Sequence, residues 1–344
     1  MRAAVITGRH QVDVIDVPVP TPSADGVVVD ISRCGICGTD IHAYQSGNPY
    51  NPAICGHEWV GTVSARGKEV RNVAEGDRII VAVPPACGVC PACRAGQGRH
   101  CSRVFLSATG RDVADPKHGG FASQLGVRAD RVVLAHPDLD DDEAAQVEPA
   151  TVTFHAVRAS LLRLGDVAVV QGAGPIGLLT MQWAKAFGAA KVIVIEPNEA
   201  RRALALSLGA TLALTPGEEA STVIREHTNG LGADIVYECV GRGPAVQSAV
   251  DQARRGGAVC LIGFPDTDAT IVPATWLVKE ISLTAALAYT HEEFAQAMTF
   301  IADGRVRLTP MHSSTVSLDQ LGDALADLGS GASTQTKVLV DPRV

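Results

Sequence analysis

The chain is predicted to be an α/β protein of two domains, one built on a doubly wound parallel sheet and the other rich in β-strands. Its 344 residues exceed what one ordinary hydrophobic core organises, and 46% of them are apolar. Near residue 150 short strands punctuated by turns give way to strands alternating with Ala/Leu-rich helical stretches. We place the β-rich domain at 1–150, completed by 288–344, and the parallel-sheet domain at 151–287.

The β-rich domain is indicated by short apolar runs, such as 27–31 and 78–83, between turn-forming residues such as Pro20 and Gly26. The second domain is indicated by the order of its segments. Strands are expected at 167–171, 191–195, 234–238 and 258–262, with helices at 177–187, 199–208 and 245–253; a further helix is expected at 291–302. The uncharged stretch 167–184 has the length of a membrane span. Its glycines, proline and glutamines, and its beginning as a strand, favour a soluble fold instead.

A glycine-rich turn joins the first predicted strand of this domain to its helix, in VAVVQGAGPIGLL. Gly172 permits the tight turn, Gly174 lets a pyrophosphate approach the backbone, and Gly177 lets helix and strand pack closely. Pro175 and Ile176 lie between them, where free N–H groups of the helix N-terminus would face the phosphates. A plain strand-to-helix turn is the alternative. The setting favours a dinucleotide site.

The choice between NAD and NADP depends on the end of the second strand. Glu196 lies 19 residues after Gly177, where a carboxylate would bind the adenosine ribose hydroxyls and repel a 2′-phosphate. Arg201 and Arg202 follow, and Arg201 belongs to the expected cofactor-binding set. Either arginine would suit the 2′-phosphate of NADP, but exposed helix arginines are common, so we expect NAD.

Four cysteines form a compact group in CGVCPACRAGQGRHC. Cys87, Cys90, Cys93 and Cys101 are close enough in sequence to close tetrahedrally on one zinc ion with no open position, which is typical of a structural site. An iron–sulfur cluster is the alternative, but no second set of cysteines accompanies the group.

A second set of ligand types lies upstream. Cys37 occurs in CGICGTDIH, and His57 and Glu58 follow in GHE twenty residues later. One sulfur, one nitrogen and one oxygen suit a zinc ion with a vacant position for a substrate.

At this point the chain resembles the zinc-dependent medium-chain dehydrogenase/reductase family, the alcohol dehydrogenase superfamily. The likeness runs along nearly the whole chain, through CGICGTDIH, GHEWVGTV, the four-cysteine lobe, HGGFAS, VEPATVTFHAV, GAGPIG, YECVG and KEISL. It implies a GroES-like catalytic domain and a Rossmann domain. It also implies a homo-oligomer, a tetramer or dimer, formed near 258–264 and 281–286.

The resemblance also implies roles for individual residues. Asp40 would hold His57, Thr39 would hydrogen-bond the substrate oxygen, and His42 would pass the released proton to solvent. Lys337 would touch the cofactor pyrophosphate. Tyr289 is left open between the substrate pocket and core packing.

The third protein ligand of the catalytic zinc is an open point. The family's alcohol branch commonly uses a second cysteine, whereas here the matching position is Glu148, which is similar to the sorbitol and butanediol branch. Two carboxylates and a thiolate would blunt the Lewis acidity of one zinc ion. We therefore expect either Glu58 or Glu148 to bind directly and the other to act through water or to exchange during turnover.

The expected function is reversible oxidation of a secondary alcohol, diol or polyol to a ketone, with hydride passing to NAD and two zinc ions per chain. The alternatives are a zinc-free quinone or enoyl reductase of the same fold and a non-enzymatic nucleotide-binding regulator. Glu148 favours a vicinal diol or polyol, since paired hydroxyls chelate zinc.

Composition limits the partners. A net charge of −8 without a basic run argues against nucleic acid, and no signal peptide is evident, so a cytoplasmic enzyme is expected.

Overall fold

The computed structural model describes residues 1–48, 51–111, 118–265 and 267–344. The chain divides into two compact units. Unit 1 comprises Met1–Glu148, Tyr289–Ala302 and His312–Val344, and unit 2 comprises Pro149–Ala288 and Asp303–Met311. The sequence placed its limits at 150/151 and 287/288 and did not predict the short return of residues 303–311 to unit 2.

Unit 2 contains a six-stranded, wholly parallel sheet. Its strands are β8 (Val167–Gln171), β9 (Lys191–Ile195), β10 (Leu212–Leu214), β11 (Ala233–Glu238), β12 (Ala253–Leu261) and β13 (Ser282–Ala285). Their spatial order is β10-β9-β8-β11-β12-β13, the 3-2-1-4-5-6 order of a Rossmann sheet. The core strands are continuous apolar runs because both faces of a parallel sheet are covered. The predicted doubly wound parallel sheet is thereby confirmed.

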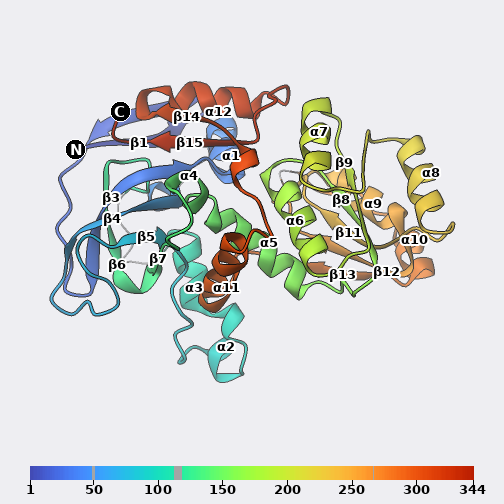
Figure 1. Ribbon diagram of the computed structural model, residues 1–344, viewed down its shortest axis with the longest axis horizontal. Coiled ribbons are helices and arrows are strands. Elements are labelled where there is room, and N and C mark those ends of the chain that lie inside the picture. The colour runs from blue at the N-terminus through green and yellow to red at the C-terminus, as the bar shows by residue number, and fades with distance from the viewer. Residues whose placement is uncertain (49–50, 112–117, 266) are drawn as a thin grey trace. The chain divides into compact units, whose positions relative to one another are not determined.

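Helices cover this sheet on both faces, with α6 on one side and α9 and α10 on the other (Figure 1). The helices assigned to this part of the chain are α5 (Val147–Ala159), α6 (Pro175–Ala186), α7 (Glu199–Ser207), α8 (Glu218–His227), α9 (Gly243–Gln252) and α10 (Pro273–Lys279), with the 3-10 turn η4 (Thr309–Met311). The winding direction of the sheet changes between β8 and β11, and the carboxyl ends of strands at such a point are where open α/β sheets bind their ligands. The glycine turn after β8 lies at this edge.

Unit 1 is built on a mixed sheet of seven strands and a separate hairpin. The hairpin is β1 (Arg2–Gly8) and β2 (Gln11–Asp16); the sheet contains β3 (Gly26–Gly35), β4 (Glu58–Arg66), β5 (Arg78–Val81), β6 (Gln124–Arg128), β7 (Val132–Leu134), β14 (His312–Ser317) and β15 (Lys337–Asp341). The order is β14-β15-β3-β4-β5-β7, with β6 paired to β3. The predicted β-rich domain is confirmed, and β15 shows that the end of the chain completes it.

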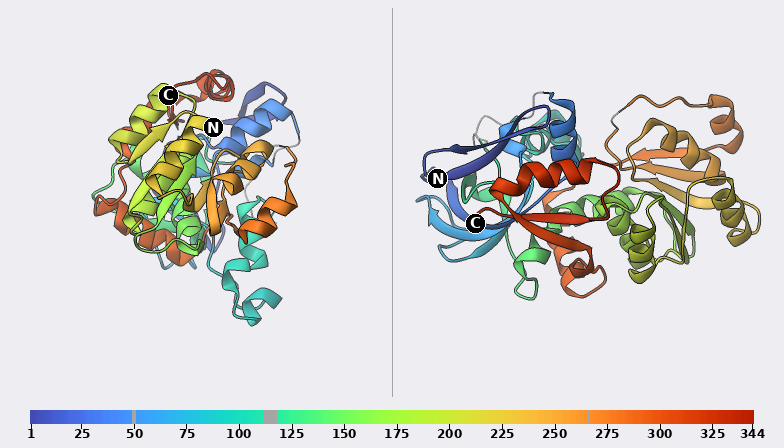
Figure 2. Two further views of the ribbon diagram at one scale, coloured as in Figure 1. Left: turned by 90° about the vertical axis from the view of Figure 1, so that its right-hand side faces the viewer. Right: turned by 90° about the horizontal axis from the view of Figure 1, so that it is seen from above.

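The helices of unit 1 are short and lie around this sheet. They are α1 (Gly38–Ser46), α2 (Pro91–Arg94), α3 (Ser102–Ala108), α4 (Asp141–Ala144), α11 (His291–Ala302) and α12 (Leu321–Gly329), with 3-10 turns at Pro52–Ile54, Gly98–His100, Ala129–Arg131 and Leu318–Gln320. The core beneath them includes Cys34 and Cys55, both fully buried. Both chain termini belong to this unit (Figure 2).

No described helix is long and apolar enough to cross a membrane. The uncharged stretch 167–184 is divided between β8 and α6 and does not form one continuous helix.

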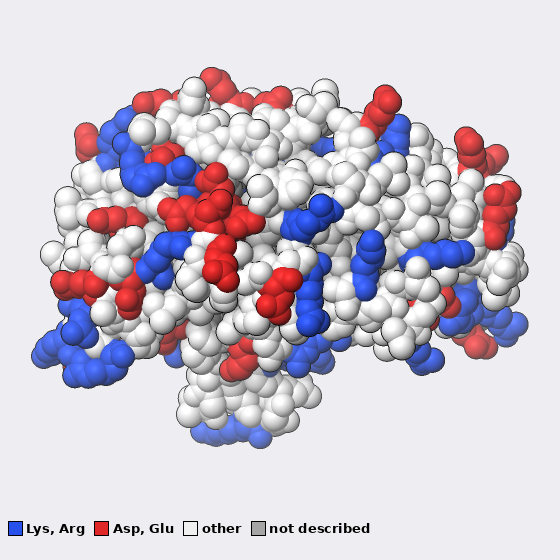
Figure 3. All heavy atoms as spheres, in the orientation of Figure 1, with Lys and Arg blue, Asp and Glu red and all other residues white. Residues whose placement is uncertain are grey.

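Acidic side chains gather over α4 (Figure 3), and arginines from the sheet lie among them. Arg78 pairs with Asp141 at 3.0 Å, and Arg33 pairs with both Asp142 and Asp341 at 2.7 Å. Arg33 thus links α4, β3 and β15, three segments far apart in the sequence.

Candidate active site

The first ligand segment is organised by the start of α1. Cys37 is the residue before the helix, and the Asp40 carboxylate accepts a hydrogen bond of 2.9 Å from the Cys37 backbone N–H. An acid three residues after the cap satisfies one of the free donors at a helix start. The motif therefore places Cys37 at a fixed helix end and puts Thr39 and His42 on the helix's first turns.

The second ligand segment, which carries His57, is packed against the HGG motif. Gly56 has a left-handed φ of 75°, and its carbonyl accepts a 2.7 Å hydrogen bond from Gly120 N–H. A β-carbon at Gly119 would lie 2.0 Å from the Cys55 carbonyl oxygen. Side chains larger than hydrogen are excluded there, so the two motifs position His57 together.

Cys37, His57 and Glu58 meet in one cluster, in which the candidate ligand atoms all lie within 4.8 Å of one another. His57 Nδ1 is 2.8 Å from the Ile54 carbonyl oxygen, so Nδ1 carries the proton and Nε2 is the nitrogen left for a metal. One thiol, one imidazole and one carboxylate at this spacing fit zinc.

The charges in the cluster act strongly on His57. Burial alone would lower the pKa of His57, but the neighbouring Cys37 sulfur, together with Asp40 and Glu148, raises it well above its ordinary value. Asp40 also accepts a hydrogen bond from Gly56 N–H at 3.3 Å, so it braces the backbones of both ligand segments. A direct bond from Asp40 to the His57 ring stays a prediction.

One carboxylate oxygen of Glu58 is paired with Lys337. The Lys337 ammonium, only 2% exposed, forms an ion pair with Glu58 Oε2 and donates to the Ile36 carbonyl at 2.9 Å. Burial alone would lower the pKa of Lys337, but Glu58 raises it, so the side chain is a cation. A β-carbon at Gly35 would lie 2.2 Å from Glu58 Oε2, so glycine makes room for the pair.

This placement bears on the role expected for Lys337. Its ammonium is paired with Glu58 of the candidate ligand cluster in unit 1, and the contact of Lys337 with the cofactor pyrophosphate stays a prediction. Nothing local in the sequence pairs residues 279 positions apart, so sequence reasoning missed the ion pair.

Glu148 lies beside the cluster without belonging to it. It occupies the first turn of α5, and burial raises its pKa to about 7, with a further rise from Glu58 that His57 and the Tyr289 hydrogen bond oppose. Among the described residues, the compact donor set contains Glu58 rather than Glu148. The sequence had left Tyr289 open between the substrate pocket and core packing; in the structure its hydroxyl is hydrogen-bonded to Glu148.

The two residues expected to handle the proton lie on α1. Thr39 Oγ1 is buried and has no hydrogen-bond partner among the described residues, as suits a hydroxyl that awaits a ligand. His42, half-buried, follows one turn later.

The four lobe cysteines form the second cluster. Their sulfur atoms lie within 4.8 Å of one another, which fits one tetrahedral zinc ion. Backbone hydrogen bonds from Cys93 and Ser102 lower the pKa of Cys90 to about 6, which favours the thiolate that a metal binds.

The glycine turn of unit 2 shows why each glycine is needed. Gly172 has a left-handed φ of 91°. A β-carbon at Gly177 would lie 1.9 Å from the Gly172 carbonyl oxygen, whereas one at Gly174 would meet nothing within 4 Å. Gly177 thus serves packing, and Gly174 leaves open space in front of the backbone. Pro175 and Ile176 begin α6 behind it.

Glu196 is held at the end of β9 by backbone groups. Its two carboxylate oxygens accept from Ala173 N–H at 2.7 Å and Asn198 N–H at 2.9 Å. Asn198 caps α7 by accepting from Arg201 N–H, and the Arg202 guanidinium donates to the Glu196 and Pro197 carbonyls. The carboxylate is therefore fixed next to the glycine turn, while Arg202 is occupied by the backbone.

Two family models match the chain, an alcohol dehydrogenase GroES-like domain over residues 23–138 and a zinc-binding dehydrogenase over residues 175–303. A sorbitol dehydrogenase of Bacillus subtilis is 32% identical, over 99% of this chain and 97% of its own. This chain belongs to the zinc-binding medium-chain alcohol dehydrogenase family. Membership confirms the resemblance and the GroES-like and Rossmann domains.

Other members of the family show the same likeness. A 2-dehydro-3-deoxy-L-galactonate 5-dehydrogenase of Pseudoalteromonas atlantica is 33% identical over 99% of this chain and 98% of its own. The crystal structure of 2R,3R-butanediol dehydrogenase from Bacillus subtilis has a TM-score of 0.84 at 26% identity, covering 99% of both chains. A zinc-binding dehydrogenase of Sinorhizobium meliloti bound to NADP has a TM-score of 0.86 at 30% identity, covering 99% of both chains. The chain is thus a zinc-type alcohol or polyol dehydrogenase with a nicotinamide cofactor.

Proposed function

We propose that this dehydrogenase reversibly oxidises a secondary hydroxyl of a vicinal diol or polyol to a ketone, with NAD as acceptor. The observation that carries the proposal is the cluster of Cys37, His57 and Glu58. Thr39 follows Cys37 by two residues, and its buried hydroxyl has no hydrogen-bond partner among the described residues. The printed names of two similar proteins, sorbitol dehydrogenase and butanediol dehydrogenase, support a substrate with neighbouring hydroxyls.

The chain's own groups divide the work of the reaction. When bound at Cys37 and His57, zinc supplies the Lewis acidity that makes the substrate hydroxyl acidic. Thr39 Oγ accepts the hydroxyl proton and donates its own onward, and His42 passes a proton to solvent. When bound at the glycine turn, NAD would accept hydride from the carbon that bears this hydroxyl, so the alcohol would lose two electrons and NAD would gain them.

The preference for NAD is supported by the fixed position of Glu196. A carboxylate held by two backbone N–H groups beside the glycine turn accepts ribose hydroxyls and repels a 2′-phosphate. The NADP found on the Sinorhizobium protein makes this a point to measure. NAD and NADP should be compared at equal concentration, and an equal or better turnover with NADP would contradict the preference.

One carboxylate would bind the catalytic zinc directly, and the other would act through water or by exchange. Glu58 lies in the compact donor set and is ion-paired with Lys337, whereas Glu148 lies beside the set, where burial raises its pKa to about 7. Both carboxylates at about 2 Å from zinc in every state would contradict this assignment.

The test of the activity is NAD reduction by the zinc-loaded protein over a panel of diols, polyols and simple secondary alcohols. Cys37→Ala and His57→Ala should abolish turnover while NAD affinity, measured by fluorescence quenching, stays close to that of the unaltered protein. Cys260→Ala, which removes a buried thiol of β12, is the matched control and should keep activity. Full activity in either ligand variant would refute the site.

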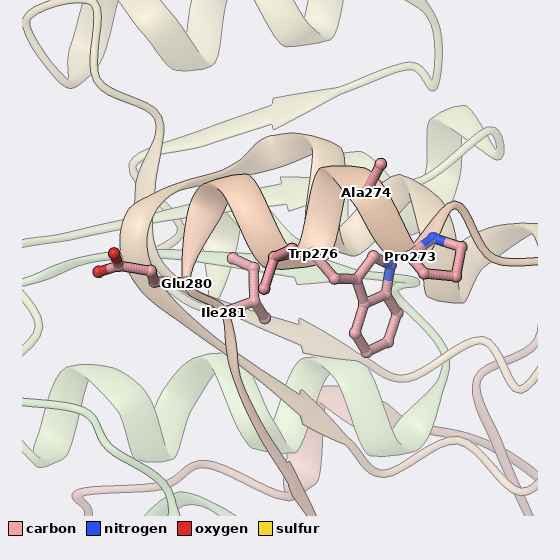
Figure 4. Close-up of a pocket in the computed structure, with 6 residues that line it drawn as sticks. Pro273, Ala274, Trp276, Glu280 and Ile281 are labelled. Carbon is pink, nitrogen blue, oxygen red and sulfur yellow. The ribbon is translucent and has the colours of Figure 1, made fainter.

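We also propose a homo-oligomer formed through the β13 edge of unit 2. The sequence had named 258–264 as well, but that segment belongs largely to β12, which is an inner strand paired with β11 and β13. Beside β13, α10 exposes Leu277 (79%) and Val278 (68%). An open, mainly apolar pocket of about 580 Å³ lies there (Figure 4), lined by Pro273, Ala274, Trp276, Leu277, Glu280 and Ile281. Light scattering should give a dimer or tetramer, and a monomer would contradict the proposal.

A further inference from the structure

Tyr289 is fixed by the start of α11. Thr290 and Glu293 form a reciprocal cap: Thr290 N–H donates to Glu293 Oε2 at 2.8 Å, and Glu293 N–H donates to Thr290 Oγ1 at 3.3 Å. The residue that precedes such a cap often packs against the residue five positions further along the chain. Here these residues are Tyr289 and Phe294, whose ring centroids lie 5.6 Å apart. Both the backbone and the ring of Tyr289 are therefore held in place.

A second anchor holds the same turn against the sheet of unit 1. His291 Nδ1 lies 2.8 Å from the Val83 carbonyl oxygen, and the Val83 backbone N–H hydrogen-bonds the Tyr289 phenol oxygen. The tyrosine is 4% exposed, so its hydroxyl has little access to water. The direction of the hydroxyl is thus set by the protein.

The Tyr289 hydroxyl is hydrogen-bonded to the Glu148 carboxylate. The two carboxylates beside Cys37 and His57 therefore have different partners: Glu58 has the Lys337 cation, and Glu148 has a phenol hydroxyl. A cation adds a compensating charge to a carboxylate, whereas a neutral donor orients the carboxylate without adding a charge.

We propose that Tyr289 is a positioning residue of the catalytic metal site, whose hydroxyl holds one oxygen of Glu148 and so fixes the orientation of this carboxylate toward the zinc. Partners that orient a metal's ligands typically contribute 10- to 100-fold, as order-of-magnitude values, to metal affinity. The inference rests on the proposed catalytic zinc site, and it deepens that proposal by assigning what orients Glu148.

The test is Tyr289→Phe, which removes the hydroxyl and keeps the ring contact with Phe294. Catalytic-site zinc affinity is measured without substrate, by competition with a chromophoric chelator. The zinc binding of the cysteine lobe alone is measured on His57→Ala, in which the four lobe cysteines are unchanged, and is subtracted. We expect a loss of about 10- to 100-fold and an altered visible spectrum of the cobalt-substituted site. Tyr237→Phe is the matched control. Its buried hydroxyl bonds Ser160 at 2.9 Å in unit 2, and its removal should leave both readouts unchanged.

A double-variant cycle shows whether Tyr289 acts through Glu148. In Glu148→Ala, which removes the acceptor of the hydrogen bond, adding Tyr289→Phe should lower zinc affinity no further, whereas independent losses that add would overturn the inference. Zinc affinity and cobalt spectrum of Tyr289→Phe equal to those of the unaltered protein would overturn it too.

Two further outcomes are distinguishable. If Tyr289→Phe does not fold, Phe294→Leu loosens the ring but keeps the hydroxyl, and we expect a smaller loss of zinc affinity; no loss would then overturn the inference. Absence of turnover in the unaltered protein would contradict the proposed function alone, because the zinc measurements use no substrate.

Discussion

At the scale of single residues, the Cys37, His57 and Glu58 cluster depends on charged side chains that are far apart in the sequence and lie together in the fold. Lys337 and Glu58 form a buried ion pair with almost no access to water. Removing one partner of such a pair leaves the other charge uncompensated, which is far more costly than removing both. The pair is therefore a structural part of the site as well as an electrostatic one.

We expect Lys337→Met to lower the free energy of unfolding by about 3–5 kcal/mol, because Glu58 is left buried and unpaired. The double variant Lys337→Met/Glu58→Gln should recover much of this loss. Denaturant unfolding at matched zinc content measures both. A single variant as stable as the unaltered protein would show that Glu58 finds another partner.

Sequence reasoning reached the residues of the site better than their contacts. Cys37, His57 and the four lobe cysteines were named from local spacing, and each group is brought together in space. The partners of Glu58 and Glu148, Lys337 and Tyr289, come from the far end of the chain. Long-range pairing leaves no local pattern, so a single sequence does not predict it.

At the scale of secondary-structure elements, the glycine turn separates packing from binding. Gly177 is pressed against the Gly172 carbonyl, whereas Gly174 faces open space. The strand and helix around the turn were predicted correctly because their apolar runs have the length and setting of a buried strand and its helix. The strand β10 was not predicted, since its three residues carry little periodicity, and the ten-residue helix α8 was not predicted either.

Gly177→Ala should destabilise unit 2 by about 1–3 kcal/mol, because the added methyl group overlaps the turn's own backbone. Gly174→Ala should keep the stability and instead weaken NAD binding, because its methyl group would face the pyrophosphate. Thermal unfolding and NAD titration of both variants test this contrast. Equal stability of the two variants would contradict the packing role of Gly177.

The cysteine lobe is an element whose order depends on metal rather than on a core of its own. Cys93→Ser should lower the zinc content by one ion per chain and lower the unfolding temperature, because three remaining thiolates bind zinc less tightly. Metal analysis and calorimetry measure these effects. His100→Ala, beside the last cysteine, is the control and should keep the full zinc content. A lobe variant with unchanged zinc and stability would show that the cluster is not a structural zinc site.

At the scale of the whole molecule, an ionic network joins the end of the chain to the sheet of unit 1. Asp341 contacts Arg343 and Arg33, and the Arg343 hydrogen bond, helped by the charge of Arg33, lowers its pKa. A lowered folded-state pKa adds stability at pH values above the unfolded value, about 3.9, and that stability is lost as the pH falls through the folded value.

Asp341→Asn should therefore reduce stability at neutral pH by roughly 1–3 kcal/mol. The gap to the unaltered protein should close below about pH 4, where Asp341 itself becomes protonated. Urea unfolding from pH 3 to pH 8 measures the gap, and Asp16→Asn, an exposed change at the end of β2, is the control. A gap that stayed constant down to the lowest pH would contradict the role of the carboxylate charge.

The chain leaves unit 1 directly after Glu148 and re-enters it at Tyr289, the two residues whose side chains are hydrogen-bonded beside the metal cluster. The main segment of unit 2 is therefore an insertion into unit 1, and the two residues that flank it are joined by a hydrogen bond. Domains are readily exchanged where their ends lie close together on the host. We expect that a different nucleotide-binding domain can replace the segment between these two residues, and that unit 1 keeps its metal ligands in place as long as the Glu148–Tyr289 hydrogen bond is preserved.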